Sequence, residues 1–178
     1  MNQAAAAPLD RAQKLAGGAA TFAVVAAIII AISAVGREVV GPAVEALRSR
    51  EITPDLRGAL NLFNAVGVFW VLALPSLLLA GALLDLSRVL EEYGKGQFFT
   101  VKAGVSVRKA AEWMLWALAF KIMISPTLFS WITQEGRGFI WNLEPFDLGL
   151  VALAAFVMVL GRVLEAAARI KEENDEIV

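Results

Sequence analysis

The chain contains four long runs of apolar residues separated by charged connections. The runs extend from Leu15 to Val35, from Gly58 to Leu84, from Trp113 to Thr133 and from Phe146 to Leu164. A helix that rises about 1.5 Å per residue needs roughly 20 apolar residues to cross a hydrocarbon core about 30 Å thick. The first three runs meet this length, and the first two hold no charged residue. The pattern therefore predicts transmembrane helices.

Charged residues interrupt the third and fourth runs. Lys121 lies inside the third run, and the fourth is free of charge only from Leu148 to Gly161. The fourth run reaches full length only if Arg162 extends its guanidinium toward the headgroups while its stem stays in lipid. A hydrophobic fraction of 58% still favours a membrane protein, because soluble domains contain about 45 to 50% apolar residues.

A cleaved secretory signal is the alternative interpretation of the first run. Arg11 and Lys14 precede it, and the small residues of Ala31-Ile32-Ser33 resemble a cleavage site. The apolar part of a signal peptide is usually about 7 to 15 residues long, whereas this run is uncharged from Leu15 to Val35. We therefore expect a membrane helix here.

Lysine and arginine concentrate on one side of the predicted membrane. Ten lie in the N-terminal segment, the second connection and the C-terminal tail, whereas five lie in the first and third connections. Because cytoplasmic loops carry an excess of these residues, we expect both termini in the cytoplasm. The predicted fold is an all-α four-helix transmembrane bundle over residues 15–170, with a flexible N-terminus at 1–14 and an acidic tail at 171–178.

The second run is predicted to continue into a cytoplasmic helical extension. Asp85 to Tyr93 contains no helix breaker, and Gly94-Lys95-Gly96 then ends the helix. Thr100 is a suitable N-cap for a helix that begins at Val101. In the first connection, Val39 to Arg50 is expected to form a short helix.

A hexapeptide recurs at the end of the second and fourth runs. Leu86 to Glu91 and Leu160 to Glu165 both read Leu-x-Arg-Val-Leu-Glu. Duplication of a two-helix unit explains this echo. Independent use of arginine as an interface anchor, with glutamate three residues later, explains it equally well.

Lys121 is the charged residue placed deepest in a predicted span. It lies eight residues past Trp113, which is about 12 Å along a helix. An ammonium at that depth is costly, so it should face the protein interior or water. Ser76 and the carbonyl of Val71, which Pro75 leaves without its usual donor, are candidate acceptors, and Asp85 is the nearest carboxylate on the cytoplasmic side. Lys121 thus either binds an anion or extends to the interface.

The sequence predicts no catalytic residue, cofactor or metal site. It contains no cysteine and no histidine, which excludes the usual zinc and haem ligands. The carboxylates of the tail from Lys171 to Glu176 are interpreted as a solvated helix end, since no glycine turn of a calcium loop accompanies them. Phosphate-binding loops and nucleophile motifs are also missing. An enzyme is therefore not expected.

Two segments resemble elements of a known family. Tyr93 to Thr100 contains Gly-x-x-Phe-Thr, formed by Gly96, Phe99 and Thr100, and the C-terminus ends on Glu-x-Asp-x-x-Val, formed by Glu173, Asp175 and Val178. Together they resemble the domain of unknown function 2975 family of four-span bacterial membrane proteins. The resemblance implies the bacterial cytoplasmic membrane and a gene neighbourhood that often includes a small helix-turn-helix regulator. It supplies no catalytic residues.

These observations lead to three functional hypotheses. The first is a regulatory protein whose cytoplasmic face holds a partner such as a transcription regulator, without binding nucleic acid itself; that face is predicted to include Tyr93, Lys95, Phe98, Phe99, Glu173 and Asp175. The second is a small oligomeric channel or transporter in which Lys121 lines an anion path. The third is an accessory subunit of a larger complex.

Overall fold

The structure is a computed structural model that describes residues 3–37, 56–97, 100–132 and 138–176. The described part is helical and contains no strand. Its helices are α1 (Gln3–Val35), α3 (Leu56–Gly94), α4 (Val101–Ala119), the π-helical turn η2 (Phe120–Ile124), α5 (Ser125–Ile132) and α6 (Pro145–Glu176). The predicted all-α class is confirmed.

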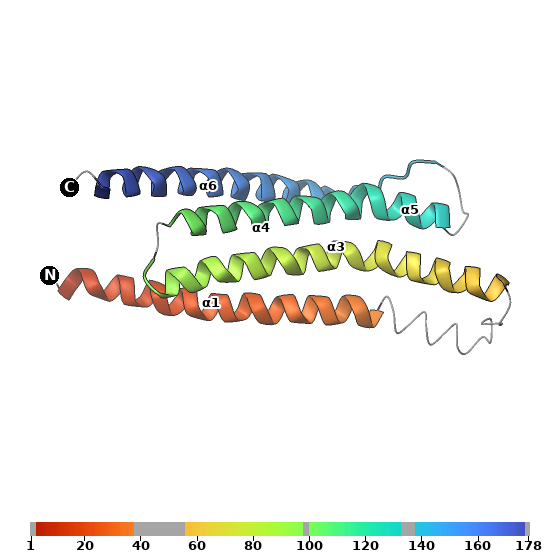
Figure 1. Cartoon of the computed structure of the whole chain (residues 1–178), viewed down its shortest axis with the longest axis horizontal. Helices are drawn as coiled ribbons and strands as arrows, with labels where there is room; N and C mark the ends of the chain where they lie inside the picture. Colours follow the sequence, from red (N-terminus) through yellow and green to blue (C-terminus); the bar gives the residue numbers. More distant parts are fainter. Residues whose placement is uncertain (1–2, 38–55, 98–99, 133–137, 177–178) are drawn as a thin grey trace.

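The long helices lie side by side in alternating directions (Figure 1). Both chain ends lie at one end of the molecule, together with the connection between α3 and α4; we call this the termini end. The start of α3 and the end of α5 lie at the opposite end, which we call the far end (Figure 1). Within the described residues α1 packs on α3, α3 on α4 and α4 on α6. The helices therefore form a row in chain order, with α1 and α6 as its outer members.

Within the part of the chain that the structure describes, four stretches are long and apolar enough to cross a membrane. They are Arg11–Val35, Val66–Gly94, Val101–Trp131 and Pro145–Asn174. Many of their large apolar side chains point outward, Phe22 and Trp116 among them. Such exposure is unfavourable in water and favourable in lipid. The chain is therefore a multi-pass membrane protein.

The helices extend beyond the predicted membrane boundaries at the termini end. Helix α1 begins at Gln3, within the segment predicted as a flexible N-terminus, and α6 continues to Glu176 through most of the predicted tail. Helix α3 is 39 residues long, which corresponds to about 57 Å and exceeds the hydrocarbon core. The short helix predicted at Val39 to Arg50 lies outside the described residues.

Local sequence determines how α3 ends and α4 begins, as predicted. Gly96 has a φ of 80°, and the N–H groups of Gly96 and Gln97 donate to the carbonyls of Tyr93 and Glu92. These are the two hydrogen bonds of a Schellman motif. Thr100 caps α4, since its hydroxyl accepts from the N–H of Ala103 at 3.1 Å. The same hydroxyl donates to Glu92 at 2.9 Å, which ties the two helix ends together.

Glycines allow α4 and α6 to approach each other closely. A Cβ atom on Gly104 would lie 2.6 Å from the backbone nitrogen of Glu165, and one on Gly161 would lie 2.7 Å from the backbone nitrogen of Arg108. Each glycine thus faces the backbone of the opposite helix. Small residues at such positions permit the close van der Waals packing that holds helices together in lipid.

Candidate functional site

An ion pair joins the third and fourth membrane segments. The Nζ atom of Lys121 lies 2.6 Å from Oδ1 of Asp147. The Asp147 side chain is completely buried, whereas 43% of the Lys121 side chain is exposed. Because an unpaired charge in a membrane interior is costly, this pairing explains how both groups are tolerated there.

The first turn of α6 holds Asp147 in position. Pro145 occupies the first helical position, where its missing N–H costs nothing. The second carboxylate oxygen of Asp147 accepts from the N–H of Glu144 at 3.2 Å, and the N–H of Asp147 donates to the carbonyl of Glu144. This reciprocal arrangement resembles a capping box. Asp147 therefore both begins α6 and neutralises Lys121.

The extended segment at residues 138–144 is attached to η2 and α5 by hydrogen bonds. Thr127 Oγ1 donates to the carbonyl of Ile140 and accepts from its N–H, both at 3.1 Å. Trp131 Nε1 donates to the carbonyl of Gly138. These hydrogen bonds satisfy backbone groups that the segment, which forms no helical turn of its own, cannot pair internally.

Two prolines leave backbone carbonyls without their usual helical hydrogen-bond donors, and groups from other segments donate to these carbonyls. Pro126 cannot donate to the carbonyl of Ile122, and the N–H of Asn142 donates to that oxygen at 3.0 Å. Pro75 leaves the carbonyl of Val71 free, as the sequence predicts, and Ser125 Oγ donates to it at 2.8 Å. Each freed carbonyl thus becomes a link between helices near Lys121.

A cavity of about 720 Å³ adjoins the ion pair. Its wall is mostly apolar and comes from α3, α4, η2, α5, α6 and the 138–144 segment. The polar groups in this wall come from Lys121, Ser76, Ser125 and Asn142. A largely apolar pocket with a few convergent polar groups is the usual form of a small-molecule site. We call it the Lys121 cavity.

The structure places two of the three predicted polar residues at this cavity. Lys121 and Ser76 line it, whereas Asp85 does not. Asp85 accepts from Trp113 Nε1 at 3.1 Å and from Arg88 at 2.7 Å. Trp113 precedes Lys121 by eight residues, about 12 Å along the helix axis, which places Asp85 far from the lysine. The partner of Lys121 is instead Asp147, which sequence reasoning did not select.

The predicted interaction surface is only partly described. Tyr93 is half-buried and packs against the cluster of Val89, Ala103 and Val107, so it stabilises the contact between α3 and α4. Lys95 is exposed and pairs with Glu91 at 2.7 Å, and this carboxylate raises the pKa of Lys95.

The remaining surface residues lie near the chain end or outside the described residues. Glu173 is exposed near the end of α6. The ends of α6 and α3 both lie at the termini end (Figure 1), and Tyr93 and Lys95 flank the last residue of α3. Phe98, Phe99 and the side chain of Asp175 lie outside the described residues.

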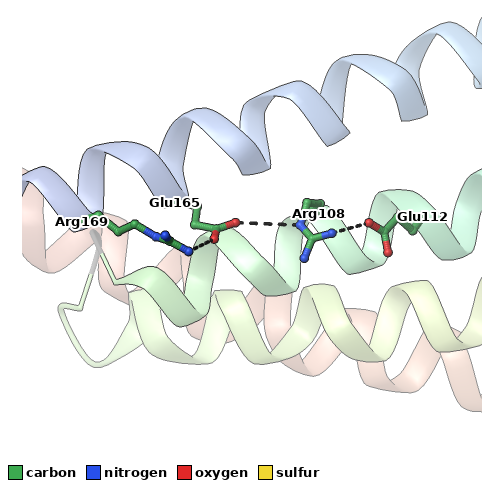
Figure 2. A network of polar contacts seen from close by, with 4 residues as sticks. All are labelled: Arg108, Glu112, Glu165 and Arg169. Atoms are coloured by element: carbon green, nitrogen blue, oxygen red, sulfur yellow. Dashed lines mark hydrogen bonds and ion pairs between the residues drawn. The ribbon is translucent and has the colours of Figure 1, made fainter.

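Charged side chains connect α4 and α6 near the termini end (Figure 2). Arg108 pairs with Glu112 at 2.6 Å and lies 3.9 Å from Glu165. Glu165 also pairs with Arg169 at 2.6 Å. Glu165 therefore lies between two arginines from different helices, beside the close approach that Gly104 and Gly161 permit.

Comparison with known proteins shows the family of this chain. Residues 19–178 match the family described as protein of unknown function (DUF2975). The chain belongs to the DUF2975 family. The resemblance seen in Gly96, Phe99 and Thr100 and in the C-terminal residues is thereby confirmed. No curated protein and no solved structure matches the chain significantly.

For this DUF2975 member, two family-like residues have clear structural roles. Gly96 ends α3 with a positive φ and Thr100 begins α4 as its N-cap. The Lys121 cavity lies elsewhere, in the membrane segments. The family match covers both regions without assigning chemistry to either.

Proposed function

We propose that this protein is a non-enzymatic regulatory protein of the bacterial cytoplasmic membrane, with both termini in the cytoplasm. In this proposal a molecule with an apolar body and an anionic or hydrogen-bond-accepting head binds in the Lys121 cavity. The termini end holds a cytosolic partner, such as a small helix-turn-helix regulator. The observation that carries the proposal is the cavity of about 720 Å³ beside the Lys121–Asp147 pair.

The composition of the cavity wall supports this ligand class. Leu72, Leu79 and Leu150 are among the apolar side chains that contribute to it, and they suit an apolar chain or ring. The exposed part of Lys121 offers a cation to an anionic head, and a charge-assisted hydrogen bond of this kind is about twice as strong as a neutral one. An amphipathic carboxylate that enters from the bilayer fits both requirements.

The ion pair connects the cavity to the termini end. Asp147 lies in the first turn of α6, and the same helix continues without interruption to Glu176. An anionic ligand that competes for Lys121 weakens the contact that holds the start of α6. Because α6 packs along α4, a shift of its first turn is transmitted toward the termini end.

Ligand binding is tested with a photoreactive long-chain fatty acid and the purified full-length protein. We expect labelling of peptides from the cavity wall, and a loss of labelling in Lys121→Met. Lys109→Gln is the matched control, because Lys109 is an exposed cation on the same helix outside the cavity. Equal labelling of wild type and Lys121→Met would overturn the ligand assignment.

The partner is tested by chemical cross-linking in native membranes, followed by purification. We expect a soluble protein attached to the wild type, with less attached to the charge-reversal variant Lys95→Glu/Glu173→Lys. Purification of the wild type without a soluble protein, together with unchanged transcription after gene deletion, would contradict the regulatory role.

A channel or transporter is the second candidate. The partly exposed Lys121 in a cavity wall and the π-helical turn η2 that interrupts the third membrane segment favour it, because transporters place interrupted helices around their substrates. In liposomes this function predicts anion flux that Lys121→Met abolishes. Absence of flux with the wild type would remove this candidate.

A further inference from the structure

A second pocket lies between α4 and α6, nearer the termini end than the Lys121 cavity. It has a volume of about 410 Å³ and is lined by Arg108, Arg162, Glu165, Ala166 and Arg169. Three guanidinium groups and one carboxylate thus surround it, which leaves an excess of two positive charges in its wall. We call it the arginine pocket.

The internal ion pairs leave cationic capacity in this pocket. Glu165 pairs closely with Arg169, and its distance to Arg108 is longer, at 3.9 Å. Arg162 is exposed and forms no ion pair with any other described residue. Among the described residues Arg162 is therefore unpaired, whereas Glu112 holds Arg108 and Glu165 holds Arg169, each at 2.6 Å. The N–H groups of Arg108 that do not bond Glu112 remain available as donors.

The pocket lies where the apolar part of α6 ends. Arg162 is the first charged residue after the uncharged stretch from Leu148 to Gly161. On the neighbouring helix, Trp113 and Trp116 are exposed a short distance further into the membrane segment. Exposed tryptophans mark the headgroup level of membrane helices. Because the pocket lies on the outer side of these tryptophans, toward the termini end, we expect it at the level of the lipid headgroups.

We propose that the arginine pocket binds the phosphate of an anionic phospholipid. Guanidinium groups bind phosphate oxygens through paired, charge-assisted hydrogen bonds, and basic pockets between membrane helices bind anionic headgroups. Arg162 and Arg108 supply donors to the phosphate. Glu165 orients Arg169 and keeps like charges apart while the pocket is empty.

The close helix approach gives the pocket its shape. Gly161 precedes Arg162 and faces the backbone of Arg108, so the two arginines extend from a region where the helices nearly touch. An ordinary basic stripe on a single helix would attract many anions without selectivity. Arginines from two helices around one carboxylate favour a single phosphate group.

The experiment compares the full-length protein in detergent with added phosphatidylglycerol, with added phosphatidylcholine and with inorganic phosphate. Native mass spectrometry measures lipid retention, and thermal unfolding measures stabilisation. The test variant is Arg108→Gln/Arg162→Gln, which removes the two proposed phosphate donors. The control is Lys109→Gln/Lys171→Gln. It removes one positive charge from α4 and one from α6, both at exposed positions outside the pocket.

We expect the wild type and the lysine control to retain phosphatidylglycerol over phosphatidylcholine. The arginine variant should bind it about thirtyfold more weakly, as follows from two arginines near an anionic surface. Equal weakening in the lysine control, or no preference in the wild type, would overturn the proposal. Stabilisation by inorganic phosphate without any response to phosphatidylglycerol would overturn the lipid as the source of the phosphate.

This test is independent of the proposed regulatory function. The arginine pocket shares no lining residue with the Lys121 cavity. If the protein retains phosphatidylglycerol but is not labelled by the fatty acid, only the ligand proposed for the Lys121 cavity is contradicted. If it is labelled but shows no preference for phosphatidylglycerol, only the phosphate site proposed for the arginine pocket is contradicted.

Discussion

At the scale of single residues, the ion pair between Lys121 and Asp147 links the cavity to the start of α6. The two partners differ in environment, since Asp147 is fully buried and Lys121 is partly exposed. A buried charge that loses its partner is more strongly destabilising than a charge that retains access to polar surroundings. Removal of the Lys121 charge and removal of the Asp147 charge should therefore destabilise the protein to different extents.

We predict that Lys121→Met lowers the thermal unfolding temperature in detergent more than Asp147→Asn does. The first change leaves a buried carboxylate unpaired, whereas asparagine retains an oxygen that accepts from the N–H of Glu144. The double variant should recover most of the loss caused by Lys121→Met. Additive effects in this double-mutant cycle would show that the two residues do not interact.

The Thr100 cap supports a second residue-level prediction. Thr100→Ala removes the acceptor for the N–H of Ala103 and the bond to Glu92, so it should destabilise the start of α4 by about 1 kcal/mol. Hydrogen exchange of the amides at the start of α4 measures this change. Thr100→Ser keeps the hydroxyl and serves as the control; faster exchange in both variants would argue against a capping role.

At the scale of elements, the contact between α4 and α6 depends on backbone proximity. Gly104 and Gly161 each face a backbone atom of the other helix, and fully buried alanines, Ala154 and Ala168, continue the small-residue surface of α6. In both copies of the repeated hexapeptide the final glutamate pairs with a cation four residues later, Glu91 with Lys95 and Glu165 with Arg169. Glu165 in addition lies 3.9 Å from Arg108 on α4.

We predict that Gly104→Val and Gly161→Val each destabilise the protein by about 3 kcal/mol, because an added side chain has to displace backbone rather than a flexible group. Thermal unfolding in detergent measures the effect. Gly149→Val is the control on α6, since a Cβ there meets no atom within 4 Å. Similar losses at all three positions would show that only helix propensity is being measured.

At the scale of the whole molecule, four helices in a row place both chain ends at one end and the 138–144 segment at the other (Figure 1). The termini end contains the apolar cluster around Val89 and the ion pairs between α4 and α6, whereas the Lys121 cavity lies further toward the far end. The larger, mostly apolar cavity and the charged contacts between α4 and α6 thus lie at different levels of the same helices. This arrangement suits the proposal that a ligand enters at the Lys121 cavity and that the termini end offers a stable surface to a partner.

The absence of cysteine permits a direct test of orientation. Single cysteines at Ala12, Asn174 and Gly138 occupy exposed positions in the structure. With intact cells and a maleimide that does not cross membranes, we expect labelling at Gly138→Cys only. Permeabilised cells provide the control, in which all three should react. Labelling of Asn174→Cys from outside would contradict cytoplasmic termini.

The sequence by itself determined the features that depend only on residues close together along the chain. Apolar runs of sufficient length specify membrane helices, because lipid requires each helix to satisfy its own backbone. The end of α3 just before Gly96 and the start of α4 just after Thr100 were also predictable, because a glycine with positive φ and a threonine N-cap act on adjacent residues. Pro75 also identified the free carbonyl of Val71, though not its donor, Ser125.

Only the tertiary structure decided which distant residues meet. Lys121 and Asp147 are 26 positions apart in the chain, and their contact depends on the register of α6 against α4 and on where α6 begins. Asp85 was the carboxylate predicted nearest to Lys121 on the cytoplasmic side, but helix register placed it beside Trp113. The cavity and the arginine pocket likewise arise between helices, where side chains from separate segments converge and no local pattern records the contact.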